Sequence, residues 1–100
     1  MLVRVFPDQA ALTSVCRRRH IRRLALFGSV LRGAQRPDSD VDLLVEFEAG
    51  REPGLLRLAQ IGAELSGLIG GRPVDLRTSA DLSRYFRDDV IRTAEVQFEA

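Results

Sequence analysis

Two aspartates, Asp40 and Asp42, stand two positions apart at the start of an otherwise apolar run that continues to Phe47. Successive side chains of a β-strand point to opposite faces, so we expect the two carboxylates to share one face. The apolar side chains share the other face: Val41, Leu43, Val45 and Phe47. Like charges held this close repel unless a cation lies between them, and hard carboxylate oxygens suit Mg²⁺. The pattern predicts a strand that carries a metal site.

A third acid, Asp75, occurs in a comparable setting. Residues 73–76, Pro-Val-Asp-Leu, indicate a short strand in which Asp75 faces away from Val74 and Leu76. If this strand neighbours the first, three carboxylates converge. Three acids can hold two divalent ions about 3.5 to 4 Å apart, which stabilises the attacking and leaving oxygens of a phosphoryl or nucleotidyl transfer.

Gly28 and Ser29 follow the apolar run 24–27, at the expected turn from a strand into a helix. Backbone N–H groups at a helix start can cradle phosphate, and glycine lets the phosphate approach. Ser29 can act as the helix N-cap at the same time. Arg32 either contacts a triphosphate or substrate or pairs with an acid at the edge of the core.

Residues 26–47, LFGSVLRGAQRPDSDVDLLVEF, closely resemble the signature of the minimal nucleotidyltransferases, small members of the DNA polymerase beta superfamily. That signature is glycine, serine, ten residues, then Asp, any residue, Asp. The resemblance extends from about residue 21 to the region 85–90, and Leu31 departs from it where relatives often carry a small residue. It implies an α+β fold, a mixed β-sheet flanked by helices, and Mg²⁺-dependent transfer of a nucleotide, with ATP as the expected donor.

The resemblance also implies roles for individual residues. Asp40, Asp42 and Asp75 would be the metal ligands for two Mg²⁺ ions, and Asp75 would also polarise or deprotonate the acceptor hydroxyl. The predicted nucleotide-binding residues are Gly28, Ser29 and Arg32.

Relatives of this type are commonly antitoxins encoded beside a HEPN-domain ribonuclease toxin, and several inactivate the toxin by adding AMP to a tyrosine. The resemblance therefore implies a HEPN toxin as protein partner and substrate. A second hypothesis is an antitoxin that neutralises its partner by binding and occlusion alone. A third is a subunit that modifies a small molecule or nucleic acid once it is assembled with another chain.

Composition bounds these hypotheses. One hundred residues, 45% hydrophobic and 29% charged, fit a single globular domain, residues 1–100. The net charge of +1 argues against a broad nucleic-acid surface, so we expect no direct nucleic-acid binding. No apolar run approaches a membrane span of ~18 residues, and the start has no signal-peptide core, so a cytoplasmic protein is expected. The single cysteine, Cys16, is expected inside a helix.

Three local patterns have plainer interpretations. The basic run over residues 17–23 is either a cationic helix C-terminus or an edge that attracts anions. His20 has no companion at metal-ligand spacing, which favours a surface or capping role. An EF-hand calcium loop starting at Asp38 would need glycine and glutamate where Leu43 and Ala49 stand, so that interpretation fails.

Periodicity and turn residues predict alternating helices and strands. The expected elements are a helix over 7–19, a strand over 23–27 that is apolar on both faces, a short helix over 29–33, a loop over 34–39, a strand over 40–48, a helix over 55–68, a strand over 73–77 and a helical tail over 81–95. Leucine and isoleucine at spacings of three or four make the helix over 55–68 amphipathic, and Gly70 and Gly71 end it.

Overall fold

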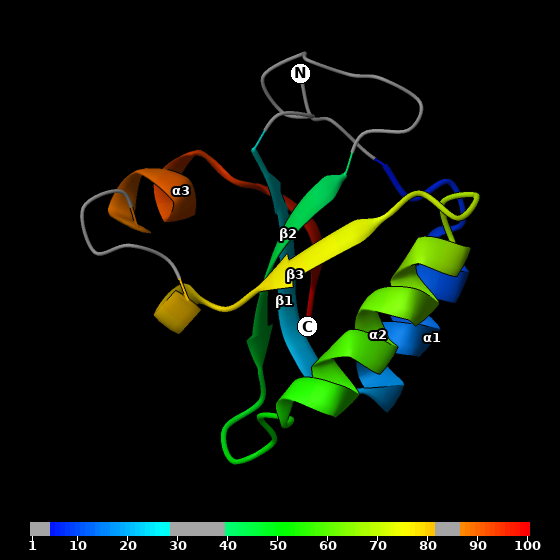
Figure 1. Cartoon of the computed structure of the whole chain (residues 1–100), viewed down its shortest axis with the longest axis horizontal. Helices are drawn as coiled ribbons and strands as arrows, with labels where there is room; N and C mark the ends of the chain where they lie inside the picture. Colours follow the sequence, from blue (N-terminus) through cyan, green and yellow to red (C-terminus); the bar gives the residue numbers. More distant parts are fainter. Residues whose placement is uncertain (1–4, 29–39, 82–86) are drawn as a thin grey trace.

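The computed structural model describes residues 5–28, 40–81 and 87–100. Its elements, in order, are α1 (Gln9–Arg18), β1 (Ile21–Phe27), β2 (Val41–Phe47), α2 (Leu55–Gly67), β3 (Val74–Arg77), a 3₁₀ turn (Ser79–Asp81), α3 (Arg87–Thr93) and β4 (Glu95–Glu99) (Figure 1). The predicted helix over 29–33, the loop over 34–39, Ser29 and Arg32 lie outside the described residues.

The strands form one mixed sheet in the order β3-β2-β1-β4. β1 pairs antiparallel with both β2 and β4, whereas β2 and β3 run parallel. β1 is therefore an interior strand, as its apolar character predicts, and Leu24, Ala25 and Leu26 are all buried. This is the predicted α+β architecture with a mixed sheet.

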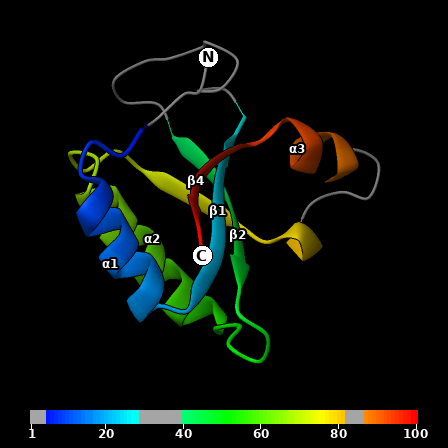
Figure 2. The same cartoon turned by 180° about the vertical axis from the view of Figure 1, so that it is seen from behind.

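Helices α1 and α2 lie side by side against one face of the sheet, and α3 lies on the other side (Figures 1 and 2). The core forms between the sheet and helices α1 and α2. The four apolar side chains of β2 that were expected on one face all belong to it: Val41, Leu43, Val45 and Phe47. By alternation, Asp42, Leu44 and Glu46 project from the opposite face.

Helix α1 is defined by its caps and its apolar side. The Asp8 carboxylate accepts a hydrogen bond from the Ala11 N–H at 3.0 Å, which makes Asp8 the N-cap. Cys16 is fully buried in the core, as predicted. After the helix, His20 adopts a left-handed conformation, with φ of 60°, and its N–H donates to the carbonyl oxygen of Arg17. The capping role expected for His20 is confirmed.

Four arginines of the basic run around this helix end form ion pairs with acids of other elements. Arg18 and Arg19 both pair with Glu64 of α2, and Arg22 and Arg23 both pair with Glu46 of β2. Arg17 and Arg18 stand in the last turn of α1, where positive charge complements the helix dipole. The structure therefore favours the helix-end interpretation over an anion-attracting edge.

Helix α2 departs from prediction at its start. Ile61 and Leu65 are buried in the core and Leu58 packs against it, but Leu55 is 88% exposed. Leu55 is the first residue of the helix, directly after the N-cap Gly54. Its periodic spacing alone therefore did not place its side chain in the core. The prediction that Gly70 and Gly71 end this helix is confirmed, because both adopt positive φ just after it.

The expected helical tail over 81–95 is wrong at its end. Helix α3 stops at Thr93, and residues 95–99 form β4, an edge strand beside β1. In this segment Val96 and Phe98 alternate with polar residues, which is the period of a strand, and Phe98 is buried in the core. The sheet gains a fourth strand because pairing with β1 satisfies backbone groups that a helix would have satisfied internally.

Within the described residues, no helix has the length and apolarity needed to cross a membrane.

Candidate nucleotidyl-transfer site

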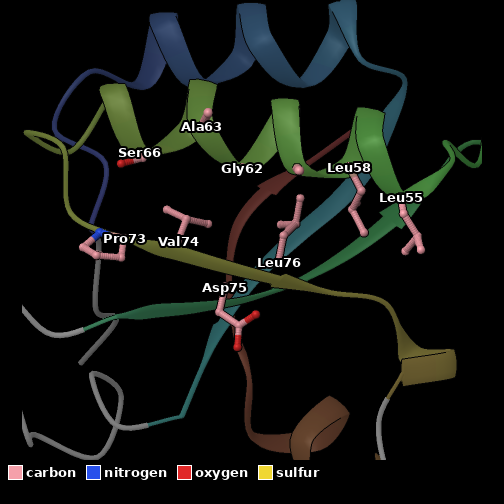
Figure 3. Close-up of a pocket in the computed structure, with 10 residues that line it drawn as sticks. Leu55, Leu58, Gly62, Ala63, Ser66, Pro73, Val74, Asp75 and Leu76 are labelled. Carbon is pink, nitrogen blue, oxygen red and sulfur yellow. The ribbon is translucent and has the colours of Figure 1, made fainter.

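Asp42 and Asp75 lie directly beside each other on neighbouring strands. The parallel register of β2 and β3 pairs Asp42 with Asp75, and the flanking residues on both strands belong to the core or pack against it. Both carboxylates therefore project from the face of the sheet opposite α1 and α2. Figure 3 shows Asp75 pointing away from α2, whereas Val74 and Leu76 point toward it. The predicted orientation of Asp75 and its adjacency to Asp42 are confirmed.

Gly28 is in close contact with the carboxylate of Asp42. In the antiparallel register of β1 and β2, Phe27 pairs with Asp42, so the next residue of the chain passes over the acid. A Cβ atom at Gly28 would lie 2.2 Å from Oδ2, 3.0 Å from Cγ and 3.1 Å from Cβ of Asp42. Gly28 also has a φ of +83°, in the left-handed region that favours glycine. Any side chain at this position would therefore force the Asp42 side chain to move.

Sequence reasoning assigned Gly28 to phosphate binding and missed this contact with Asp42. The contact depends on which residue of β1 pairs with Asp42, and the thirteen residues between Gly28 and Asp42 contain no local pattern that reveals this register. The predicted phosphate-binding role stays a prediction, and the structure adds a second reason for glycine here. The backbone at Gly28 lies directly against the carboxylate of Asp42.

Asp40 stands one residue before β2 and is exposed. The Val41 N–H donates to the carbonyl oxygen of Pro73 at 2.8 Å, which ties the start of β2 to the residue before β3. Asp40 therefore precedes the same strand end at which Asp42 and Asp75 lie. Its role as a metal ligand stays a prediction from the signature.

Arg77 is the partner that the structure gives to Asp75. Its Nε donates to Oδ1 of Asp75 at 3.1 Å, and the two side chains are 49% and 41% exposed. The two residues are separated by two positions in β3, so they project from the same face. Arg77 was not among the residues predicted for the site, although its spacing from Asp75 was a usable signal.

The donor set fits a magnesium site in part. Among residues 5–28, 40–81 and 87–100, no group of three or more His, Cys, Asp or Glu side chains lies close enough to hold a metal ion. Mg²⁺, however, is usually bound through one or two carboxylates together with substrate phosphates and water. The neighbouring carboxylates of Asp42 and Asp75 meet that requirement, and the two-ion arrangement stays a prediction.

An open groove lies on the other side of β3. It has a volume of about 490 Å³, and apolar residues of α2 and β3 line it, among them Leu55, Leu58 and Val74 (Figure 3). Asp75 contributes to its border, but its carboxylate points to the opposite face of the strand. The groove and the acid pair are thus separated by the edge strand β3.

The fold and the acid pair define a class of protein. A family model described as "Nucleotidyltransferase domain" matches residues 9–98, so the chain belongs to the nucleotidyltransferase domain family. The membership and the fold predicted from residues 26–47 are confirmed, as is the assignment to nucleotidyl transfer.

Particular relatives narrow the class. The chain is 39% identical over 72 residues to the protein adenylyltransferase MntA of Thermococcus cleftensis, a match that covers 72% of this chain and 70% of the relative. A solved structure assigned to a minimal nucleotidyltransferase shares 44% sequence identity and has a TM-score of 0.68, covering 86% of this chain and 85% of the other. The chain is thus a minimal nucleotidyltransferase domain related to MntA.

A third match concerns the fold alone. A crystal structure of a toxin–antitoxin with AMP-PNP has a TM-score of 0.71 at 18% identity, and the match covers 93% of this chain and 74% of the other. The fold of this chain is therefore also found in a toxin–antitoxin protein crystallised with an ATP analogue.

Proposed function

We propose that this chain is a cytoplasmic antitoxin that transfers AMP from ATP to a tyrosine of a HEPN ribonuclease toxin and thereby inactivates it. The observation that carries the proposal is the register pairing of Asp42 with Asp75 on one face of the sheet, with Gly28 directly over Asp42. The similarity to a protein adenylyltransferase supports a protein as the acceptor. The fold shared with a toxin–antitoxin protein supports a toxin as that protein.

In the proposed reaction, the acceptor oxygen attacks the α-phosphorus of ATP and pyrophosphate leaves. Asp40, Asp42 and Asp75 would hold the cations that the reaction requires, and Asp75 accepts the proton of the tyrosine hydroxyl as the new phosphoester bond forms. Bound Mg²⁺ would stabilise the negative charge that develops on the attacking and leaving oxygens. Gly28 and Ser29, with Arg32, hold the triphosphate of ATP.

AMP on the toxin would block its ribonuclease activity by charge and bulk. The added phosphate repels anionic RNA, and the nucleoside occupies space beside the catalytic motif. A covalent product would also outlast the complex between antitoxin and toxin.

Occlusion without transfer is the competing function, and the geometry of the site supports transfer. A binding antitoxin has no use for a glycine with positive φ pressed against an aspartate, or for two aspartates in register on neighbouring strands. Two carboxylates in register on one face are also the ligand arrangement that Mg²⁺ uses together with substrate phosphates, which supports a catalytic use.

The intact mass of the acceptor tests the proposal. The purified chain would be incubated with ATP, Mg²⁺ and the HEPN protein encoded beside it, and we expect the HEPN protein to gain the mass of one or more AMP units on tyrosine. The matched control is the Asp42→Asn variant, which keeps the shape of the side chain and should give no mass shift. An unmodified HEPN protein after incubation with the wild-type chain would refute the proposal.

A further inference from the structure

The pairing of Arg77 with Asp75 places a fixed positive charge where the proposed function needs a divalent cation. Arg77 Nε and Asp75 Oδ1 are 3.1 Å apart, and both side chains are about half exposed. Asp75 also stands beside Asp42 in the register of β3 and β2. The guanidinium therefore offsets part of the negative charge of a carboxylate pair that would otherwise be held together on one face.

A second carboxylate, that of Asp81, interacts electrostatically with Arg77. The pKa of Asp81 lies below its usual range, chiefly because the Thr78 N–H donates to it, then because the Thr78 hydroxyl does, and also through the positive charge of Arg77. Thr78 donates to the same oxygen of Asp81 at 3.1 Å from its N–H and at 3.0 Å from its hydroxyl. Asp81 is thus held as an anion close enough to Arg77 for the two charges to interact.

Arg77 therefore donates a hydrogen bond to Asp75 in the site and is also attracted by the charge of Asp81 outside it. Because both Arg77 and Asp75 are partly exposed, their pair is worth little and can exchange. A cation that binds Asp75 would displace the guanidinium from Oδ1, and Asp81 would keep it from becoming an isolated charge. Arg77 is also repelled by any divalent ion at Asp75, whatever the exact position of that ion.

We infer that Arg77 acts as the internal counter-ion of Asp75, competing with the divalent cation for this carboxylate and so lowering the metal affinity of the site. This inference rests on the proposed function, since it takes Asp75 as a metal ligand. Its consequence is that Asp75 binds metal more weakly in the absence of nucleotide than it would without Arg77. The phosphates of the nucleotide would then supply part of the affinity of the site for the ion.

Titration with Mn²⁺, followed by the electron paramagnetic resonance of the free ion, tests the inference without a need for turnover. We expect Arg77→Gln to bind Mn²⁺ about two- to fivefold more tightly than wild type in the absence of nucleotide, the range that an exposed ion pair can contribute. Arg77→Lys keeps the charge and should restore an affinity close to wild type. Arg57→Gln is the matched control, because it removes an exposed arginine from α2, on the opposite face of the sheet.

The Asp75→Asn variant separates this inference from the proposed function. If Asp75 is a ligand, Asp75→Asn should weaken Mn²⁺ binding, and Arg77→Gln should have no further effect in that background beyond the change seen with Arg57→Gln. Weakened binding in Arg77→Gln would mean that the arginine orients Asp75 as a ligand rather than competing for it, and would overturn the inference alone. Unchanged binding in Asp75→Asn would refute the metal role of Asp75 in the proposed function.

Discussion

Replacement of Gly28 by alanine should disable the site while the fold survives. The new Cβ would lie 2.2 Å from Oδ2 of Asp42, so this oxygen must move by about 1 Å to reach an ordinary contact distance of 3.4 Å or more. Rotation of the carboxylate alone does not relieve the clash, because Cγ and Cβ of Asp42 would also lie at 3.0 and 3.1 Å. The whole Asp42 side chain, or the strand end that carries it, has to shift.

The expected loss can be divided into two parts. An alanine held at φ of +83° costs about 1–2 kcal/mol of stability, since the left-handed region crowds a Cβ atom. A shift of about 1 Å in a catalytic group costs ~10²-fold in rate. We therefore expect Gly28→Ala to reduce kcat/KM for AMP transfer by about 100-fold or more and to remain folded.

Gly50→Ala is the control for backbone strain. Gly50 has a φ of +77°, close to that of Gly28, but a Cβ atom there would meet nothing within 4 Å. Both variants should lose a similar free energy of unfolding in urea titrations, and only Gly28→Ala should lose transfer. Equal transfer rates for the two variants would show that the position of the Asp42 carboxylate does not matter to the reaction.

Three further predictions concern the scaffold. Burial raises the pKa of Cys16 to about 12, so the thiol should react with a disulfide reagent only as fast as the protein unfolds. Relief of the left-handed strain in His20→Gly should raise the free energy of unfolding by about 0.5 kcal/mol in urea and leave transfer unchanged. Partial burial raises the pKa of Glu64, but hydrogen bonds and charge from Arg18 and Arg19 outweigh it and lower the pKa below 4.5. The ion pairs of Glu64 with Arg18 and Arg19 therefore stabilise the fold above pH 4.5, and this stabilisation is lost as the pH falls through the lowered pKa. Glu64→Gln should lower the free energy of unfolding by about 0.5–1 kcal/mol at pH 7 and leave it unchanged in acid.

Local alternation was enough to predict the faces of the two central acids. Asp42 lies between Val41 and Leu43, and Asp75 lies between Val74 and Leu76, so burying the apolar neighbours forces both carboxylates onto the other face. Their adjacency was a conditional prediction, because the order of strands in a sheet is decided by tertiary packing. The mixed sheet was predicted from the alternation of strands with helices along the chain, and the resemblance of residues 26–47 to a known signature agrees with it.

Most of the features that escaped prediction depend on contacts between distant segments. β4 forms because β1 offers a free edge to residues 95–99, and no local pattern reveals that edge. Leu55 satisfies the helical period of α2 but begins the helix at its exposed end, where the sheet no longer covers it. The contact of Gly28 with Asp42 arises from a strand register. The Arg77–Asp75 pair is the exception, since two residues at this spacing in a strand always share a face.

The most direct test of the central claim is the ribonuclease activity of the HEPN toxin after this chain has been removed from it. The toxin would be incubated with ATP, Mg²⁺ and either wild-type protein or the Asp40→Asn, Asp42→Asn variant, then purified under denaturing conditions, refolded and assayed on RNA. We predict that toxin treated with wild type stays inactive and carries AMP, whereas toxin treated with the variant regains full activity. Toxin that regains activity after either treatment, with an unshifted mass, would contradict the account and leave occlusion as the mode of neutralisation.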